Sequence, residues 1–219
     1  MSDFRDELYV RSGRPIEGLS DWLWIKGDGG PNTDGGAWLG PREDWIHSHS
    51  IKYFTHVKNY NVCVQAGGNL GLYPRLLANR FKTVYTFEPD SLNFHCLVNN
   101  CQVDNVIKIN AALGAVNSFC TVMRNNRSNV GMHKTIEDVN GVVPIIAIDS
   151  LNLNACDMIC LDTEGYEYNI IRGALYTIEK FKPVITCENK DGADILDLIG
   201  QFGYKVIDVS VADTIFAAE

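Results

Sequence analysis

The sequence predicts one α/β domain with an open, mostly parallel sheet and helices on both faces. Three observations carry this prediction. Residues 59–219 alternate short β-branched runs with helical patterns, and a glycine-rich turn follows the first run. The last two runs lie too close together for a helical crossover. They therefore predict a closing antiparallel hairpin.

The elements of the domain follow from periodicity and from turn signals. Helical faces are indicated by Phe94, Leu97, Val98 and Cys101, by Ile171, Ala174, Leu175 and Ile178, and by Ile195, Leu198, Ile199 and Phe202. We expect seven main strands, over residues 61–65, 84–87, 106–109, 157–161, 183–187, 204–209 and 214–217. Two further extended runs, 119–123 and 142–148, flank a polar loop over residues 124–134.

Residues 1–58 form an N-terminal extension before this domain. They hold all four tryptophans and a stretch from residue 27 to 36 that is rich in Gly, Pro, Asp and Asn. That stretch is typical of turns. The tryptophans fit two interpretations: anchors that pack on the core, or part of a lid or partner surface.

Composition narrows the class of protein. The formal net charge is −8, so a phosphate backbone would be repelled on average and we expect no nucleic-acid partner. No apolar run approaches the roughly 18 residues that span a bilayer, and residues 1–7 lack a signal-peptide pattern. The seven cysteines form no CxxC pair, which predicts buried, reduced thiols and no metal site. We therefore expect a cytoplasmic protein without a membrane partner.

A glycine turn and an acidic residue together predict a ligand that contains adenosine. The turn Gly67-Gly68-Asn69-Leu70-Gly71 follows the first strand, where glycines allow close backbone approach and a helix N-terminus offers free N–H groups. A purely structural turn would use glycine as well. Glu88, however, ends the second strand, where a carboxylate can accept both hydroxyls of a ribose.

A second acidic segment follows the buried strand over residues 157–161. Asp162, Glu164 and Glu167 lie at or just beyond the carboxyl edge of the sheet, where ligands bind in such folds. We interpret Asp162 and Glu164 as functional residues. Glu167 is interpreted as a solvated residue at a helix start, where a negative charge complements the helix dipole.

The chain from about residue 62 to 188 resembles the FkbM-type methyltransferase family. The matching segments are Gln65-Ala66-Gly67-Gly68-Asn69-Leu70-Gly71, Phe87-Glu88-Pro89, Asn110-Ala111-Ala112-Leu113-Gly114, Asp162 to Glu167, Ile171-Arg172-Gly173-Ala174, and Pro183 to Glu188. These segments occur in the family's order and at its spacing. Gln65 and Cys160 depart from the family pattern, which usually has an acidic residue and a lysine there.

This resemblance implies a Rossmann-like class I methyltransferase fold with a seven-stranded sheet, and S-adenosylmethionine as the cofactor. Glu88 would hold the ribose, and Asp162 would face the cofactor's amino group or the methyl-transfer centre. The other cofactor contacts implied are Gln65, Gly67, Asn69 and Gly71 along the methionine part, and Asn110 and Ala111 beside the adenine. Gln65 would remove a negative charge near the cofactor's ammonium group.

The family also implies O-methylation of a glycan or a small hydroxylated metabolite. A hydroxyl is a poor nucleophile, so its methylation needs a base, for which Asp162, Glu164 and Glu188 are candidates. His133, in the polar loop, is more readily interpreted as a surface histidine. Two alternatives stay open: a nicotinamide-dependent oxidoreductase, which the turn and Glu88 would also serve, and a non-catalytic module that binds the cofactor.

Overall fold

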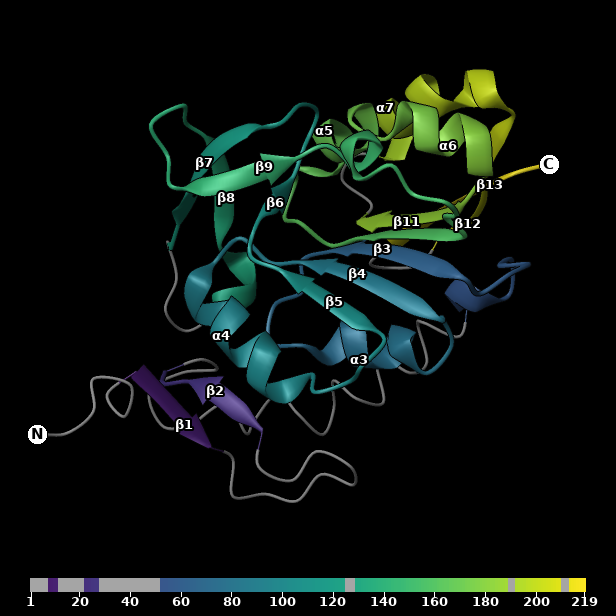
Figure 1. Ribbon diagram of the computed structural model, residues 1–219. Coiled ribbons are helices and arrows are strands. Elements are labelled where there is room, and N and C mark those ends of the chain that lie inside the picture. The colour runs from purple at the N-terminus through teal and green to yellow at the C-terminus, as the bar shows by residue number, and fades with distance from the viewer. Residues whose placement is uncertain (1–7, 12–21, 28–51, 125–128, 189–191, 210–212) are drawn as a thin grey trace, which may run out of the picture.

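A seven-stranded sheet forms the centre of the molecule (Figure 1). The computed structural model describes residues 8–11, 22–27, 52–124, 129–188, 192–209 and 213–219. In spatial order the strands are β12 (Tyr204–Val209), β13 (Asp213–Ala218), β11 (Val184–Glu188), β10 (Met158–Leu161), β3 (Val62–Ala66), β4 (Thr83–Phe87) and β5 (Val106–Ile109). Strand β13 is antiparallel to β11 and β12, and the other neighbours are parallel. The predicted fold class is confirmed.

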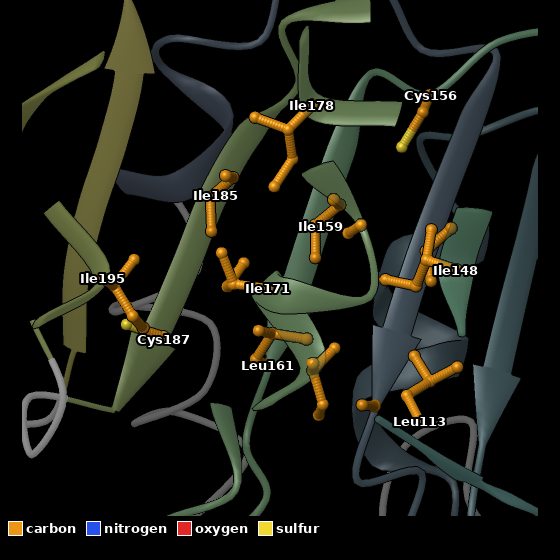
Figure 2. Close-up of a cluster of buried hydrophobic side chains, with 14 of the residues drawn as sticks. Leu113, Ile148, Cys156, Ile159, Leu161, Ile171, Ile178, Ile185, Cys187 and Ile195 are labelled. Carbon is orange, nitrogen blue, oxygen red and sulfur yellow. The ribbon is translucent and has the colours of Figure 1, made fainter. Parts of the chain in front are cut away.

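Helices cover both faces of this sheet (Figure 1). One face carries α3 (Leu72–Ala78) and α4 (Ser91–Asn100), and the other carries α5 (Glu167–Arg172), α6 (Leu175–Phe181) and α7 (Gly192–Ile199). Strand β10 shows why two cores result, since its side chains alternate between the faces. Met158 and Cys160 pack toward α3 and α4, whereas Ile159 and Leu161 pack toward α5 to α7 (Figure 2).

The single helix expected around Ile171 to Ile178 is two helices, α5 and α6, which meet at Gly173. Glycine is required there because a Cβ would lie 2.0 Å from the carbonyl oxygen of Gly114. The carboxylate of Asp149 accepts hydrogen bonds from the backbone N–H groups of Tyr176 and Thr177, which caps α6. The predicted apolar face is nevertheless correct, since Ile171 and Ile178 are fully buried.

The chain between β5 and β10 builds a second, four-stranded sheet. Its spatial order is β6 (Ala112–Leu113), β9 (Val143–Ile146), β7 (Ser118–Met123) and β8 (Lys134–Glu137). The short 3₁₀ helix η1 (Val130–Met132) lies between β7 and β8, and η2 (Ile148–Leu151) follows β9. The two extended runs predicted here are confirmed, but their assembly into a separate sheet was not foreseen.

Helix α4 is buried on two sides, and this corrects its predicted apolar face. Val98 was expected in the core but is 40% exposed, whereas Cys96 and Asn100 are buried. Leu97 packs toward the sheet, while Cys96 packs against the N-terminal strands. Asn100 accepts a hydrogen bond from the backbone N–H of Leu23 and donates to the carbonyl oxygens of Leu23 and Leu70.

The N-terminal strands β1 (Tyr9–Arg11) and β2 (Leu23–Ile25) form an antiparallel pair beside α4. Trp22 and Trp24 are 2% and 1% exposed and share an apolar cluster with Leu70, Cys96 and Val130. Two of the four tryptophans therefore pack on the domain. Trp38 and Trp45 lie outside the described residues.

All seven cysteines are buried and none forms a disulfide, as predicted. Burial raises the pKa of Cys120 to about 11 and that of Cys160 to about 12, so both thiols are protonated at neutral pH. Within the described part of the chain, no helix combines the length and apolar character that a membrane crossing needs.

Candidate active site

The candidate site lies where β3, β4 and β10 end side by side. Ala66, the last residue of β3, is the register partner of the last residue of both β4 and β10. The residues that follow these three ends are Gly67, Glu88 and Asp162. The parallel sheet thus brings three residues that are distant in the sequence to one edge.

The glycine turn is required by the backbone itself. Gly67 has a φ of +82°, and its N–H donates to the carbonyl oxygen of Phe87 at 3.1 Å. Gly71 has a φ of +103° and is the N-terminal cap of α3. L side chains rarely adopt such angles, so both glycines have a structural role before any ligand is considered.

Glu88 is buried and fixes this turn. Its Oε2 accepts a hydrogen bond from the backbone N–H of Asn69 at 2.7 Å, and its Oε1 accepts one from that of Asp90 at 2.8 Å. Burial raises the pKa of Glu88 to about 7, against these two hydrogen bonds. Each carboxylate oxygen keeps a second lone pair, so Glu88 can also accept from the hydroxyls of a ribose.

The acidic segment after β10 is held by Glu167. This residue is fully buried, and its Oε1 accepts hydrogen bonds from the backbone N–H and the Oγ1 of Thr163, each at 2.8 Å. The interpretation of Glu167 as a solvated residue is therefore wrong. Its carboxylate shapes the turn that carries Asp162 and Glu164, and Glu164 has a left-handed φ of +56°.

Gln65 lies beneath the turn and is fully buried. Its Nε2 donates to the carbonyl oxygen of Ala66 at 2.9 Å, and its Oε1 accepts a hydrogen bond from the hydroxyl of Thr86. The contact between Gln65 and the cofactor stays a prediction. In the structure, however, both polar atoms of the side chain have protein partners.

Asn110 and Ala111 follow β5. The Nδ2 of Asn110 donates to the carbonyl oxygen of Glu88 at 2.8 Å and, at 3.3 Å, to that of Pro89. Ala111 is 1% exposed and belongs to the core shared with α5 to α7. Asn110 thus supports the backbone around Glu88, and its predicted place beside the adenine stays a prediction.

Asp90 is a site residue that the sequence did not single out. Its carboxylate caps α4 by accepting from the N–H of Leu92, and it also accepts from Arg124 Nε at 2.7 Å and His133 Nδ1 at 2.8 Å. Burial opposes ionisation, but the hydrogen bonds from His133 and Arg124 outweigh it and hold the pKa of Asp90 below its usual range. Only its position before a helix signalled the cap, because the other partners lie 34 and 43 residues away.

His133 is not a surface histidine, which corrects the interpretation from the sequence. Its side chain is only 7% exposed. Its Nδ1 contacts Asp90, and its Nε2 is buried without a hydrogen-bond partner among the described residues. The polar loop thus turns one ring inward.

Part of this constellation lines a cavity of about 140 Å³. Its lining residues are Ala66, Gly67, Asn69, Phe87, Glu88, Pro89, Asp90, Asn93, Ala112, Leu113, Val122, Asn129, Val130, Gly131, His133, Thr135, Asp162, Thr163, Glu164, Tyr166 and Ile170. Five predicted site residues are therefore brought together: Gly67, Asn69, Glu88, Asp162 and Glu164. Four others do not line the cavity: Gln65, Gly71, Asn110 and Ala111. The Glu188 side chain lies outside the described structure.

Comparisons with known structures give distant similarities. One is the methyltransferase FkbM from Methylobacillus flagellatus KT, at 17% identity and a TM-score of 0.48, where the match covers 72% of this chain and 43% of that one. Another is the magnesium protoporphyrin IX methyltransferase from Synechocystis PCC 6803 with bound SAM, at 10% identity and a TM-score of 0.47, covering 88% and 87%. The chain thus spans less than half of the first protein. No curated protein matches the sequence.

A family model gives the assignment. The model of the methyltransferase FkbM domain matches residues 65–206, which is well over half of the chain and includes the glycine turn, Glu88 and the acidic segment after β10. This match decides between the open alternatives in favour of a methyltransferase. The chain belongs to the methyltransferase FkbM domain family and is an S-adenosylmethionine-dependent methyltransferase.

Proposed function

We propose that this enzyme methylates a hydroxyl oxygen of a glycan or a small hydroxylated metabolite. The observation that carries the proposal is the charge of the cavity. Asp162 and Glu164 line it together with Glu88, Asp90 and His133, while no lysine or arginine is among its described lining residues. Such a lining suits an uncharged acceptor and disfavours one that carries phosphates.

The carboxylates supply what an O–H nucleophile needs. S-adenosylmethionine brings a methyl group already activated on a positively charged sulfur, so the protein has to align the acceptor, exclude water and remove a proton. Glu88 would hold the ribose, while Asp162 would face the cofactor's amino group or the transfer centre. Glu164 would accept the proton of the acceptor hydroxyl as it is methylated.

The backbone at Glu164 supports a functional role for this residue. A non-glycine residue in the left-handed region costs roughly 1–2 kcal/mol and persists only where its surroundings impose it. Here the neighbouring Thr163 is fixed by the buried carboxylate of Glu167, which holds the turn in this conformation. A strained turn at the carboxyl edge of β10 is consistent with a preorganised base.

The experiment is transfer of an isotopically labelled methyl group from S-adenosylmethionine to a panel of acceptors. The panel pairs neutral sugars and hydroxylated small molecules with their amino and phosphorylated counterparts. We expect product only from acceptors that carry a free hydroxyl and no charged amino or phosphate group. Glu164→Gln should lower kcat by roughly 10²–10⁴-fold, the usual contribution of a general base, while S-adenosylhomocysteine binds unchanged.

Glu179→Gln is the matched control, because Glu179 is exposed on α6 and does not line the cavity. Its activity should equal that of the unaltered enzyme. Methylation of amines alone would contradict the proposal, as would a Glu164→Gln variant with full kcat.

A further inference from the structure

The contact with Asp90 determines which tautomer a neutral His133 ring adopts. Its Nδ1 lies 2.8 Å from Oδ2 of Asp90, whose pKa is held low, so that carboxylate is ionised and can only accept. Nδ1 must therefore carry the hydrogen and donate it. In the neutral ring, Nε2 is then an acceptor.

This acceptor has no hydrogen-bond partner among the described residues, and its ring borders the cavity. Nε2 is buried, no hydrogen bond to it is made by the described residues, and His133 is one of the residues that line the cavity. A buried acceptor that lacks a donor is costly to a fold, and native structures satisfy nearly all of them. A ligand in the cavity that brings an O–H group would satisfy this one.

Neighbouring contacts place His133 at the Glu88 end of the cavity. A positive charge on His133 would lower the pKa of Glu88, so the two side chains are electrostatic neighbours. Two residues before His133, Gly131 packs on Asn69: a Cβ on Gly131 would lie 3.3 Å from Nδ2 of Asn69. The backbone N–H of Asn69 in turn donates to Glu88.

We infer that His133 is a cofactor-positioning residue whose Nε2 accepts a hydrogen bond from one ribose hydroxyl of S-adenosylmethionine. Glu88 accepts from the other hydroxyl. Asp90 orients the ring through its hydrogen bond with Nδ1, and Arg124 in turn donates a hydrogen bond that holds Asp90 in place. The inference concerns the cofactor that the family establishes, and it does not depend on the methyl acceptor proposed above.

The test is calorimetry on the full chain with S-adenosylhomocysteine and with 5′-methylthioadenosine, which keeps the ribose but lacks the amino acid. His133→Asn retains an amide N–H near the position of Nδ1 and so can still donate to Asp90, but it has no group near Nε2. We expect it to bind both probes about tenfold more weakly, the loss of roughly one hydrogen bond. His133→Gln, which returns an acceptor near Nε2, should recover much of that affinity.

Two further comparisons separate this contact from a structural role. His56→Asn is the control, because His56 is exposed and does not line the cavity; it should bind as the unaltered chain does. Of 2′-deoxy- and 3′-deoxy-5′-methylthioadenosine, one should bind with the same affinity to the unaltered chain and to His133→Asn, because the hydroxyl that meets Nε2 is already missing.

The inference is overturned if His133→Asn binds both probes normally, or if it weakens S-adenosylhomocysteine and leaves methylthioadenosine unchanged. It is also overturned if the variant's defect is equally large with both deoxy probes. Should His133→Asn fail to fold, the unaltered chain can still overturn the inference: a deoxy probe that binds it as tightly as methylthioadenosine does would show that one of the two hydroxyls has no acceptor.

Discussion

A Cβ on Gly67 would lie 1.9 Å from the carbonyl oxygen of Asp162. The turn after β3 and the acidic segment after β10 are thus in backbone contact, with no room for a side chain between them. The backbone N–H of Asp162 also donates to the carbonyl oxygen of Ala66 at 3.2 Å. A change that displaces one of the two strand ends will therefore displace both the glycine turn and the acidic segment.

Gly67→Ala should therefore disrupt both stability and cofactor binding. The substitution adds a backbone clash to the cost of a positive φ, and we expect a loss of more than about 3 kcal/mol in unfolding free energy. Urea denaturation measures this loss. Gly165→Ala is the matched control, because Gly165 has a φ of +98° with nothing within 4 Å of an added Cβ. It should cost only about 1–2 kcal/mol, and an equal cost at both positions would refute the clash.

Gln65→Glu should destabilise the fold and should not improve the cofactor site. The amide donates to the carbonyl oxygen of Ala66, and a carboxylate cannot replace that donor in a fully buried position. We expect a loss of about 1–3 kcal/mol in unfolding free energy at pH 8, and a smaller loss at pH 5, where a buried carboxyl is protonated. Gln102→Glu, at an exposed position, should change stability by less than about 0.5 kcal/mol.

Tighter binding of S-adenosylhomocysteine by Gln65→Glu without loss of stability would contradict this expectation. It would also favour the charge effect that the comparison with the family pattern implied.

Glu88 should make the stability of the ligand-free chain fall as pH rises. Its folded pKa is about 7, above the ordinary value of 4.5, so the folded state holds the proton more tightly than the unfolded state between these two values. The free energy of unfolding should decrease by up to about 3 kcal/mol as the pH rises through that window. Above it, Glu88 should contribute no further pH dependence. Melting temperatures of the unaltered chain and of Glu88→Gln, from pH 4.5 to 8, measure the effect.

The Glu88→Gln profile should be flatter across this window, and a profile parallel to that of the unaltered chain would assign the dependence to other groups. Binding adds a second readout. Ribose hydroxyls favour the ionised carboxylate, so S-adenosylhomocysteine should bind more tightly as pH rises toward 8, and Glu88→Gln should reduce its affinity at least tenfold.

Asn100→Ala should release the N-terminal strands. The variant leaves the buried N–H of Leu23 and the carbonyl oxygens of Leu23 and Leu70 without their partner, which costs about 2–4 kcal/mol. Hydrogen exchange at residues 22–27 measures local release. Asn99→Ala is the control, since among the described residues Asn99 donates only to His95 on its own helix, and its cost should stay below about 1 kcal/mol. Equal protection in both variants would mean that Asn100 does not anchor β2.

The sequence predicted those features that depend on local pattern and on strand order. The apolar run before Asp162 and the position of Glu88 after β4 were sufficient to place both residues at one edge of a parallel sheet, because the ends of parallel strands coincide. The closing hairpin followed from the short distance between its strands.

The features that the sequence did not predict depend on contacts that hydrophobic periodicity does not show. Glu167 is buried because its carboxylate accepts hydrogen bonds from the turn at Thr163, and hydrophobic periodicity does not predict the shape of that turn. His133 is buried against Asp90, which lies 43 residues away in the sequence. The buried face of α4 contains Asn100 because a second layer, the N-terminal strands, covers the side of the helix that would otherwise meet water. A polar residue at such a position is indistinguishable from a surface residue until its partners are known.

The docking of β2 on α4 bears on how this protein is to be shortened for expression. A fragment that starts at residue 59, where the compositional change would suggest a cut, would uncover Leu70, Cys96 and Val130, which Trp22 and Trp24 now cover. Leu70 belongs to the glycine turn, and Val130 precedes His133 by three residues. The truncation would therefore disturb the segments that carry the cavity-lining residues. Fragments and fusions of this enzyme should keep residues 22–27 attached to the chain that they cover.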